Sequence, residues 1–108
     1  MSFDVISTKK FTREIKRLVK KFPSLKQEYA TLIDSLEAHP IQGTLIGNDC
    51  YKIRVSIASK GKGKSGGARI ITNVYINGKT VFLLTIYDKS EQDNITPKEL
   101  EKLLKQLR

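Results

Sequence analysis

The side chains that could do chemistry gather in one basic stretch that runs from Lys52 to Arg69. Every charged residue in it is positive, and its centre is a glycine-rich segment that runs from Lys60 to Gly67. The cations are Lys52, Arg54, Lys60, Lys62, Lys64 and Arg69. Glycines let a phosphodiester come close to the backbone, and lysines supply point charges for it. Cations without acids repel one another, and a bound polyanion relieves that repulsion. We therefore expect a phosphate-backbone site, with a solvated hairpin tip as the alternative reading.

Nucleotide hydrolysis is a poor explanation of this stretch. The segment from Ala58 to Ser65 is close to the phosphate-binding pattern G-x-x-x-x-G-K-[ST], with alanine in place of the first glycine. That pattern requires a helix after its serine, because the helix amides receive the phosphates. Here the residues that follow, from Ala68 to Ile71, have the composition of a strand.

Few other residues offer catalytic groups. His39 is the only histidine and follows a predicted helix, where it is a C-terminal cap or a surface residue. Asp88, Glu91 and Asp93 are expected in a solvated turn rather than in a metal site. Cys50 is the only cysteine, which excludes an intrachain disulfide and a cysteine-based metal site.

The chemistry left to the chain uses lysine, arginine and tyrosine. RNA brings its own nucleophile, the 2′-hydroxyl, so a protein need only align it, assist proton transfer and stabilise the charged phosphorane. Arginine and lysine suit the last task, because charge develops on the phosphoryl oxygens in the transition state. Tyr87 ends a predicted strand, where it could stack on a base or take part in proton transfer. A core tyrosine is the alternative.

Two amphipathic helices and a short strand are predicted ahead of the basic stretch. The strand is expected near Phe3–Val5. Apolar residues at helical spacing predict a helix over residues 8–22 and a second one from Leu25 that Pro40 ends. Ser24 and Gln27 have the spacing of a capping box for the second helix. Because few residues separate the helices, they should form an antiparallel hairpin.

The rest of the chain predicts three strands and a closing helix. Alternation over residues 51–57, and β-branched and aromatic runs over 70–75 and 81–87, predict the strands. Asn77-Gly78 indicates a type I′ hairpin turn, and Thr96-Pro97 with Glu99 indicates a helix start. The order β-α-α-β-β-β-α predicts an α+β fold, with residues 1–108 as a single domain whose helices pack on a small antiparallel or mixed sheet.

The composition narrows the class of protein. The chain has 108 residues, and 20 lysines and arginines against 11 acidic residues give a net charge of +9. This length fits one compact domain and excludes large multi-domain enzymes. The charge favours a polyanionic partner, above all nucleic acid. No apolar run is long enough to span a bilayer and no signal peptide is recognisable, so we expect a cytoplasmic protein.

Three segments together resemble the RelE/ParE superfamily of toxins, above all its HigB-type and RelE-type members. They are residues 51–54, 60–70 and 84–89, and the resemblance extends over essentially the whole chain. It implies the toxin of a type II toxin–antitoxin module, a ribosome-dependent endoribonuclease that cuts messenger RNA by attack of the 2′-hydroxyl. It also implies a RelE-like fold, a cognate antitoxin as partner, and no metal or other cofactor.

The same resemblance implies roles for individual residues. The implied catalytic group consists of Arg54, Lys60, Lys62, Lys64, Arg69 and Tyr87. Arg69 would stabilise the phosphorane or protonate the leaving oxygen, and Tyr87 would stack on or orient the nucleotide. The general base stays open between a loop lysine and Tyr87. Contacts with messenger RNA or the small ribosomal subunit are implied for Lys52, Lys89, Lys9, Arg13, Lys16, Arg17 and Lys20. For the helix residues, an ordinary solvated face is the alternative.

Two other functions are compatible with these residues. One is that of a ParE-type toxin, which inhibits gyrase, although the dense charge of the strand–loop–strand favours the nuclease. The other is that of a non-catalytic basic module that binds RNA or the ribosome. A gyrase inhibitor would cause DNA damage with messenger RNA intact, and a binding module would leave RNA uncut.

Overall fold

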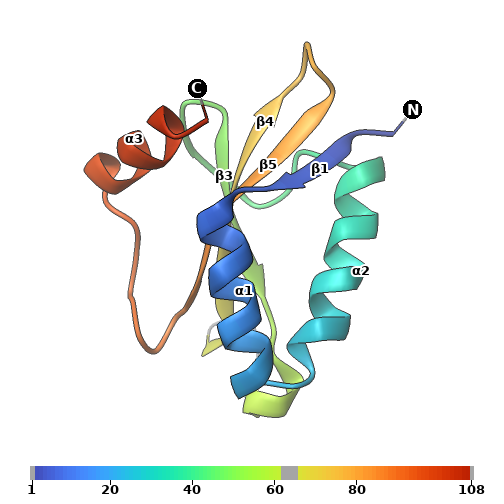
Figure 1. Ribbon diagram of the computed structural model, residues 1–108, viewed down its shortest axis with the longest axis vertical. Coiled ribbons are helices and arrows are strands. Elements are labelled where there is room, and N and C mark those ends of the chain that lie inside the picture. The colour runs from blue at the N-terminus through green and yellow to red at the C-terminus, as the bar shows by residue number, and fades with distance from the viewer. Residues whose placement is uncertain (1, 62–65, 108) are drawn as a thin grey trace.

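A mixed sheet forms the centre of the fold (Figure 1). The computed structural model describes residues 2–61 and 66–107 of the chain. The strands are β1 (Asp4–Ser7), β2 (Thr44–Gly47), β3 (Cys50–Val55), β4 (Ala68–Tyr75) and β5 (Thr80–Asp88). Their order is β1-β5-β4-β3-β2, with β1 parallel to β5 and all other neighbours antiparallel. The structure confirms the α+β class.

One face of the sheet is covered by the predicted helical hairpin, α1 (Lys9–Lys21) and α2 (Leu25–Ala38). The apolar stripe of α1 is buried against the strands, as its helical spacing requires. The Thr8 hydroxyl accepts a hydrogen bond from the Phe11 amide at 3.2 Å, which satisfies one of the free N–H groups at the start of α1. His39 takes the C-terminal cap of α2 and is exposed, as predicted.

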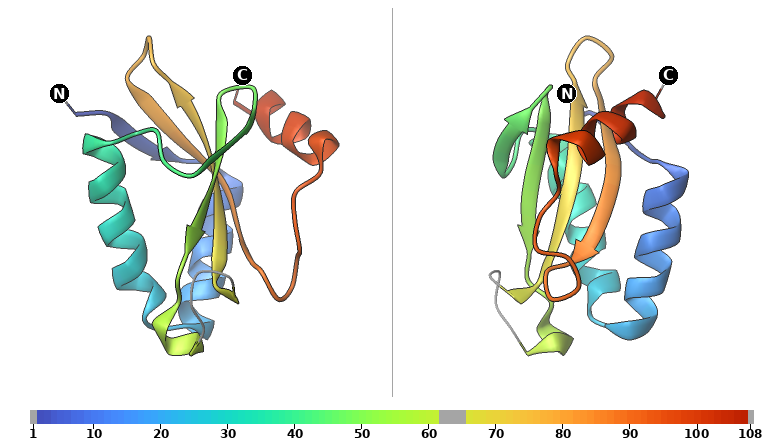
Figure 2. Two further views of the ribbon diagram at one scale, coloured as in Figure 1. Left: turned by 180° about the vertical axis from the view of Figure 1, so that it is seen from behind. Right: turned by 90° about the vertical axis from the view of Figure 1, so that its left-hand side faces the viewer.

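The other face is covered by α3 (Pro97–Lys105). In the right-hand view of Figure 2, α3 lies in front of the strands and α2 lies behind them. The predicted start of α3 is confirmed, because the Thr96 side chain and the Glu99 side chain each bond the backbone of the other residue. Leu100 and Leu103 of α3 pack on a second core that includes Ile71 and Tyr87. The sheet therefore has a buried layer on each face.

The strand β2 and the turn types differ from the prediction. β2 was not predicted, because it has only four residues and none of them is buried, so no alternation marks it. Asn48 and Asp49 have φ of 53° and 59°, which makes the β2–β3 connection a turn of the primed type. Between β4 and β5 the prediction of a hairpin is confirmed, but the type I′ turn at Asn77-Gly78 is wrong. Lys79 alone has a positive φ there, and its amide bonds the Ile76 carbonyl at 3.0 Å.

The predicted capping box of α2 is also wrong. Ser24 stands at the N-cap, but its side chain makes no capping bond. Its hydroxyl instead contacts the Glu28 carboxylate at 3.1 Å and the Ser59 hydroxyl at 2.8 Å. A tertiary contact with the short 3₁₀ turn Ala58–Lys60 replaces the local cap, and it fixes the residues that lead into the glycine-rich segment.

Candidate nucleic-acid interface

Strand register brings three of the predicted site residues into one row. Arg54 of β3 lies opposite Arg69 of β4, and Arg69 lies opposite Tyr87 of β5. Directly opposite residues point to the same face, with their Cβ atoms about 4.5–5.5 Å apart. Lys52 stands two residues earlier on β3, on the same face as Arg54. A row of two guanidinium groups and a phenol thus crosses the sheet on the face that carries α3.

One residue of this row is exposed and two are buried. Arg54 is exposed and has no carboxylate partner among the described residues. Arg69 is only 4% exposed, and its Nη1 donates to the Ala68 carbonyl at 3.1 Å. Tyr87 is 5% exposed and packs in the second core beneath α3. Of the three, Arg54 alone is open to a ligand in this conformation.

Tyr87 is therefore a core side chain here rather than an open stacking platform. Its hydroxyl is buried and has no hydrogen-bond partner among the described residues. Burial raises the pKa of the phenol, an effect that the nearby Arg69 cation partly opposes. The phenol is protonated at neutral pH, so it can donate a proton or a hydrogen bond but is a poor general base.

Lys60 does not present the free cation that the basic stretch predicts. Its ammonium pairs with the Asp88 carboxylate and donates to the Ser90 hydroxyl at 3.2 Å. The Lys60 side chain is only 10% exposed and that of Asp88 is fully buried, with the Lys60 Nζ 5.5 Å from the centre of the Phe22 ring. The expectation that these cations lack a counter-charge is wrong for Lys60, because the fold brings in an acid from the end of β5.

Asp88 likewise does not lie in a solvated turn. Burial by itself raises its pKa, but hydrogen bonds from Lys60 and from the Ser90 amide and hydroxyl outweigh burial and hold the pKa below its ordinary value. No pattern in the sequence marks Asp88 as the partner of Lys60, since Lys60 lies in the 3₁₀ turn Ala58–Lys60 and Asp88 at the end of β5, and only the tertiary fold brings them together.

The two ends of the glycine-rich segment are held by adjacent residues of the β5 end. Lys60 pairs with Asp88, and the Lys89 amide donates to the Gly67 carbonyl at 3.0 Å. Gly67 has no room for a side chain, because a Cβ there would lie 2.0 Å from the Val55 carbonyl oxygen. The predicted site residues Lys62 and Lys64 lie outside the described residues.

Residues after β5 also interact with Lys89 and Lys52, two residues predicted to contact RNA or the ribosome. Lys89 pairs with Asp93, whose pKa this ion pair lowers. The Lys52 ammonium lies 3.5 Å from the Asn94 side-chain oxygen. These partners draw part of the predicted basic surface into contacts within the chain.

The basic face of α1 divides into paired and open cations. The Arg17 guanidinium binds the Glu91 carboxylate at 2.9 Å, and the Lys21 ammonium reaches the same group at 3.4 Å. This contact raises the pKa of Arg17 and lowers that of Glu91. Lys16 and Lys20 are exposed and have no carboxylate partner among the described residues.

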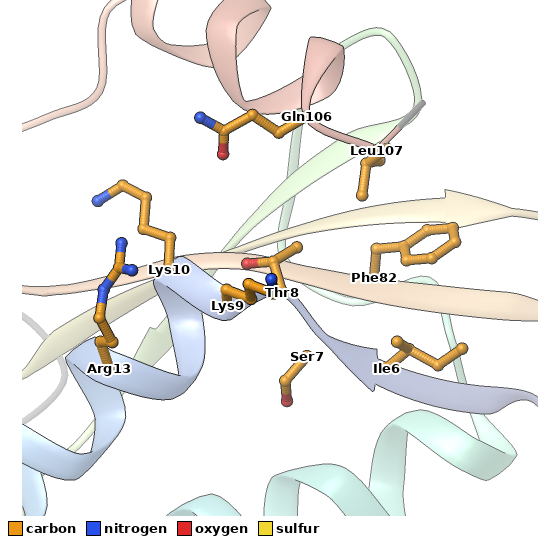
Figure 3. Close-up of a pocket in the computed structure, with 9 residues that line it drawn as sticks. All are labelled: Ile6, Ser7, Thr8, Lys9, Lys10, Arg13, Phe82, Gln106 and Leu107. Carbon is orange, nitrogen blue, oxygen red and sulfur yellow. The ribbon is translucent and has the colours of Figure 1, made fainter.

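Lys9 and Arg13 line a cavity of about 550 Å³ at the start of α1 (Figure 3). Lys10 lines it as well, although the sequence did not single this residue out. Within the described ranges, no three histidine, cysteine, aspartate or glutamate side chains come together as metal ligands. No helix there has the length and apolar character that crossing a bilayer requires.

Comparison with known proteins agrees with this architecture. A family model described as the RelE toxin of the RelE/RelB toxin–antitoxin system matches residues 5–107. A variant of the E. coli toxin RelE in which two arginines are replaced by alanine, in the free state, has a TM-score of 0.66 and 16% identity, with 100% of both chains covered. The isolated E. coli RelE toxin has a TM-score of 0.59 and 19% identity, over 99% of this chain and 100% of that one.

A third similar structure contains a bound partner. It is an E. coli RelE variant in complex with an antitoxin RelBc peptide, with a TM-score of 0.57 and 20% identity, over 90% of this chain and 98% of that one. At such identities the likeness of the structures establishes the fold, whereas the family model establishes the family.

Proposed function

The chain belongs to the RelE toxin family, and from this premise we propose that it is the toxin of a type II toxin–antitoxin module that cuts messenger RNA on the ribosome. The observation that carries the proposal is the row Arg54–Arg69–Tyr87. A row of cations with a protonated phenol at one end suits a reaction in which charge develops on phosphoryl oxygens.

The reaction needs only RNA and this row, together with one base. The 2′-oxygen forms a bond to the adjacent phosphorus and loses its proton, and the bond from phosphorus to the 5′-oxygen breaks. The products are a 2′,3′-cyclic phosphate and a 5′-hydroxyl, which takes up a proton. Arg54 and Arg69 stabilise the phosphorane, and Arg69 or the Tyr87 phenol supplies the proton to the leaving oxygen. The base stays open between a loop lysine and Tyr87, since an amine and a phenol are both protonated at neutral pH unless their surroundings lower the pKa.

Two residues of the row are covered by other parts of the protein. Arg69 and Tyr87 are nearly inaccessible, and Tyr87 packs in the second core with residues of α3. RNA can reach them only when that cover moves, so the described conformation is a resting state. Binding to the ribosome would supply the free energy that shifts the protein to the open state.

We also propose the partners and the compartment. The exposed Lys16 and Lys20 on α1, together with Arg54, offer cations to the phosphates of ribosomal and messenger RNA. A cognate antitoxin would bind the toxin, as the RelBc peptide binds the E. coli variant. Translation places this activity in the cytoplasm.

A cell-free translation reaction tests the proposal. The purified chain is added to messenger RNA with and without ribosomes, and new RNA 5′ ends are mapped. We expect cuts inside codons only when ribosomes are present, and at least a tenfold slower reaction for Arg54→Ala, the loss expected for one electrostatic contact to the transition state. Lys26→Ala, which removes an exposed cation of α2 outside the row, should cut normally. Intact messenger RNA under all conditions would overturn the proposal, and DNA damage in that case would point to gyrase.

The second candidate is a non-catalytic module that binds RNA or the ribosome. The burial of Arg69 and Tyr87 favours it, because a merely electrostatic binder needs neither residue exposed. Arg69→Ala separates the two functions. The enzyme should lose cleavage while it keeps most of its affinity for the ribosome, whereas a binding module has no cleavage to lose.

A further inference from the structure

The ion pair of Lys60 lies on the opposite face of the sheet from the row of site residues. Asp88 directly follows Tyr87 on β5, and successive side chains of a strand point to opposite faces. Tyr87 packs in the second core with residues of α3. The Lys60 ammonium, which pairs with Asp88, lies 5.5 Å from the centre of the Phe22 ring, and Phe22 packs against the core beneath α1 and α2. The pair is therefore behind the row, on the face that carries the helical hairpin.

The 3₁₀ turn that carries Lys60 is fixed to the helical hairpin. The Ala58 amide donates to the Glu28 carboxylate at 2.8 Å, and the Ser59 amide donates to the Ser24 hydroxyl at 2.9 Å. In Figure 1 the turn is the yellow-green segment beside the connection between α1 and α2. The side chain of Lys60 therefore starts from a backbone that α2 holds in place, and it reaches from there to the end of β5.

The contacts around the pair leave the Lys60 ammonium little to offer to a phosphate. The Asp88 oxygen that binds this ammonium also accepts hydrogen bonds from the Ser90 amide at 3.0 Å and from the Ser90 hydroxyl at 2.8 Å. The ammonium itself donates to the Ser90 hydroxyl at 3.2 Å. Its charge is thus compensated by a buried carboxylate, and part of its hydrogen-bonding capacity is used within the chain.

The position of Tyr87 depends on the backbone at the end of β5. Its hydroxyl has no hydrogen-bond partner among the described residues. In the described part of the chain, strand pairing reaches Tyr87 from β4 alone, since β1 ends opposite Leu83. The contacts of Asp88 with Lys60 and Ser90 fix the residue that follows Tyr87, and none of these contacts involves α3. The pair can therefore hold the end of β5 while α3 moves on the other face.

We propose that Lys60 and Asp88 position Tyr87 for the cleavage reaction and that neither side chain contacts RNA. The ion pair connects the 3₁₀ turn on the helical hairpin to the residue after Tyr87, so the phenol keeps its place beside Arg69 when the site opens. This inference rests on the proposed function, because it assigns a role in the same reaction. It replaces the catalytic role that the resemblance to RelE/ParE toxins implies for Lys60.

A double-mutant cycle separates positioning from contact with RNA. Lys60→Met, Asp88→Asn and the two substitutions together are compared with the wild type. Single-turnover cleavage is measured on ribosomes that carry messenger RNA, at several ribosome concentrations in excess over the toxin. Met and Asn keep the approximate size of the replaced side chains, and the double variant buries no unpaired charge.

Positioning predicts a loss of rate rather than of binding. Each single variant should lower the maximal rate at least about tenfold, because a small displacement of a reacting group costs that much or more. The ribosome concentration at half-maximal rate should change by less than about threefold, since no contact with RNA is lost. The double variant should be no slower than the single variants, because both substitutions break the same interaction.

Contact between Lys60 and RNA predicts a different pattern. Asp88→Asn would then free the Lys60 ammonium for RNA and cleave at least as fast as the wild type, whereas Lys60→Met would be slow. Lys60→Met would also reduce the slope of log affinity for RNA against log salt by about 0.7, the contribution of one phosphate contact. Positioning predicts that this slope stays unchanged.

Leu36→Ala is the control for a general loss of stability. Leu36 is fully buried near the C-terminal end of α2, and that end of α2 lies far from the 3₁₀ turn (Figure 1). The substitution leaves a cavity and lowers the free energy of unfolding without touching the ion pair. At a temperature at which thermal unfolding shows each variant to be folded, Leu36→Ala should cleave within about threefold of the wild type, since the reacting groups keep their positions.

Hydrogen exchange gives a readout that needs no ribosome. The amides of residues 84–88 should exchange faster in Lys60→Met and in Asp88→Asn than in the wild type, and by more than in Leu36→Ala, because loss of the pair frees the end of β5. If Asp88→Asn does not fold, the exchange of these amides in Lys60→Met and the salt slope of that variant decide the inference.

The outcomes separate the inference from the proposed function. Unchanged exchange at residues 84–88, wild-type cleavage by the single variants, or an equal loss of rate in Leu36→Ala overturns the inference and leaves the proposed function intact. A slow Lys60→Met beside a fast Asp88→Asn also overturns the inference and makes Lys60 a contact to RNA. If the wild type cuts no RNA, the proposed function fails and the inference fails with it.

Discussion

Asp88 is a fully buried carboxylate that forms an ion pair with Lys60. Removal of one member of a buried ion pair leaves the other charge uncompensated, which is more destabilising than the pair itself is stabilising. Asp88 also precedes Lys89, whose amide donates a hydrogen bond to the Gly67 carbonyl. The end of β5 therefore holds both ends of the glycine-rich segment.

Asp88→Asn should lower the free energy of unfolding by about 3 kcal/mol, because Lys60 is then left nearly buried without a counter-ion. Urea unfolding at neutral pH measures this change. Glu91→Gln is the matched control, since it breaks the exposed contact with Arg17 and should change the stability by less than about 1 kcal/mol. Equal effects of the two substitutions would contradict a special role for the buried pair.

The lowered pKa of Asp88 predicts a pH dependence of stability. A carboxylate whose pKa is lower in the folded state contributes stability above its ordinary value, here 3.8, and loses that contribution as pH falls through the folded-state pKa. Unfolding measured from pH 6 down to pH 2 should therefore show the wild type and Asp88→Asn converging at the acid end. A constant difference between them over the whole range would contradict the assignment of the lowered pKa to Asp88.

Removal of the Tyr87 hydroxyl should affect stability and activity differently. Its buried hydroxyl has no hydrogen-bond partner in the part of the chain that the structure describes, so Tyr87→Phe should leave the free energy of unfolding unchanged or raise it by up to about 1 kcal/mol. If the phenol donates a proton to the leaving oxygen, cleavage should slow by about a hundredfold. Unfolding curves and single-turnover cleavage measure the two effects, and normal cleavage by Tyr87→Phe would remove Tyr87 from the chemistry.

At the scale of elements, the site depends on how closely β3 and β4 approach each other. Gly67→Ala places a methyl group 2.0 Å from the Val55 carbonyl oxygen, so the strands must separate next to Arg54 and Arg69. We expect a loss of more than about 2 kcal/mol in the free energy of unfolding, of the order seen for overpacked sites. Gly47→Ala meets no atom and should lose only the strain of its positive φ, about 1 kcal/mol. Similar losses at both glycines would contradict the close approach.

The helices were predictable from the sequence because each carries a complete local signal. The apolar stripe of α1 and the Thr96 cap of α3 depend only on residues a turn or two apart. The strand β2 had no such signal, since Leu45 is exposed and the strand is defined by its pairing with β3. The sequence signal at Ser24 was misleading, because its hydroxyl forms a hydrogen bond with Ser59 of another element instead of capping α2.

The candidate site was also predictable only in part, where local patterns in the sequence determine it. Side-chain alternation placed Arg54 with Lys52, and strand register then brought Arg69 beside Arg54 and Tyr87 beside Arg69. Burial was not predictable, because it depends on where α3 and the end of β5 pack. Lys60 therefore belongs to an ion pair, and Tyr87 lies beneath α3.

At the scale of the whole molecule, the net charge of +9 overstates the cations available to RNA. Lys10, Arg17, Lys21, Lys60 and Lys89 are engaged by acids of the same chain. Arg54, Lys16 and Lys20 have no such partner in the described residues, so β3 and α1 each keep open positive charge.

This distribution predicts which cations set the salt dependence of RNA binding. Each phosphate contact to single-stranded RNA contributes about 0.7 to the slope of log affinity against log salt, so Arg54→Ala should reduce that slope by about 0.7. Arg17→Ala should leave the slope nearly unchanged, because Glu91 already neutralises the Arg17 guanidinium. Fluorescence titrations with one labelled RNA measure both slopes. The salt concentration is varied from about 50 to about 300 mM, a range in which counterion release dominates the affinity. If Arg17→Ala lowered the slope as much as Arg54→Ala, RNA would have to displace Glu91 on binding, and the end of β5 would then move away from α1 in the bound state.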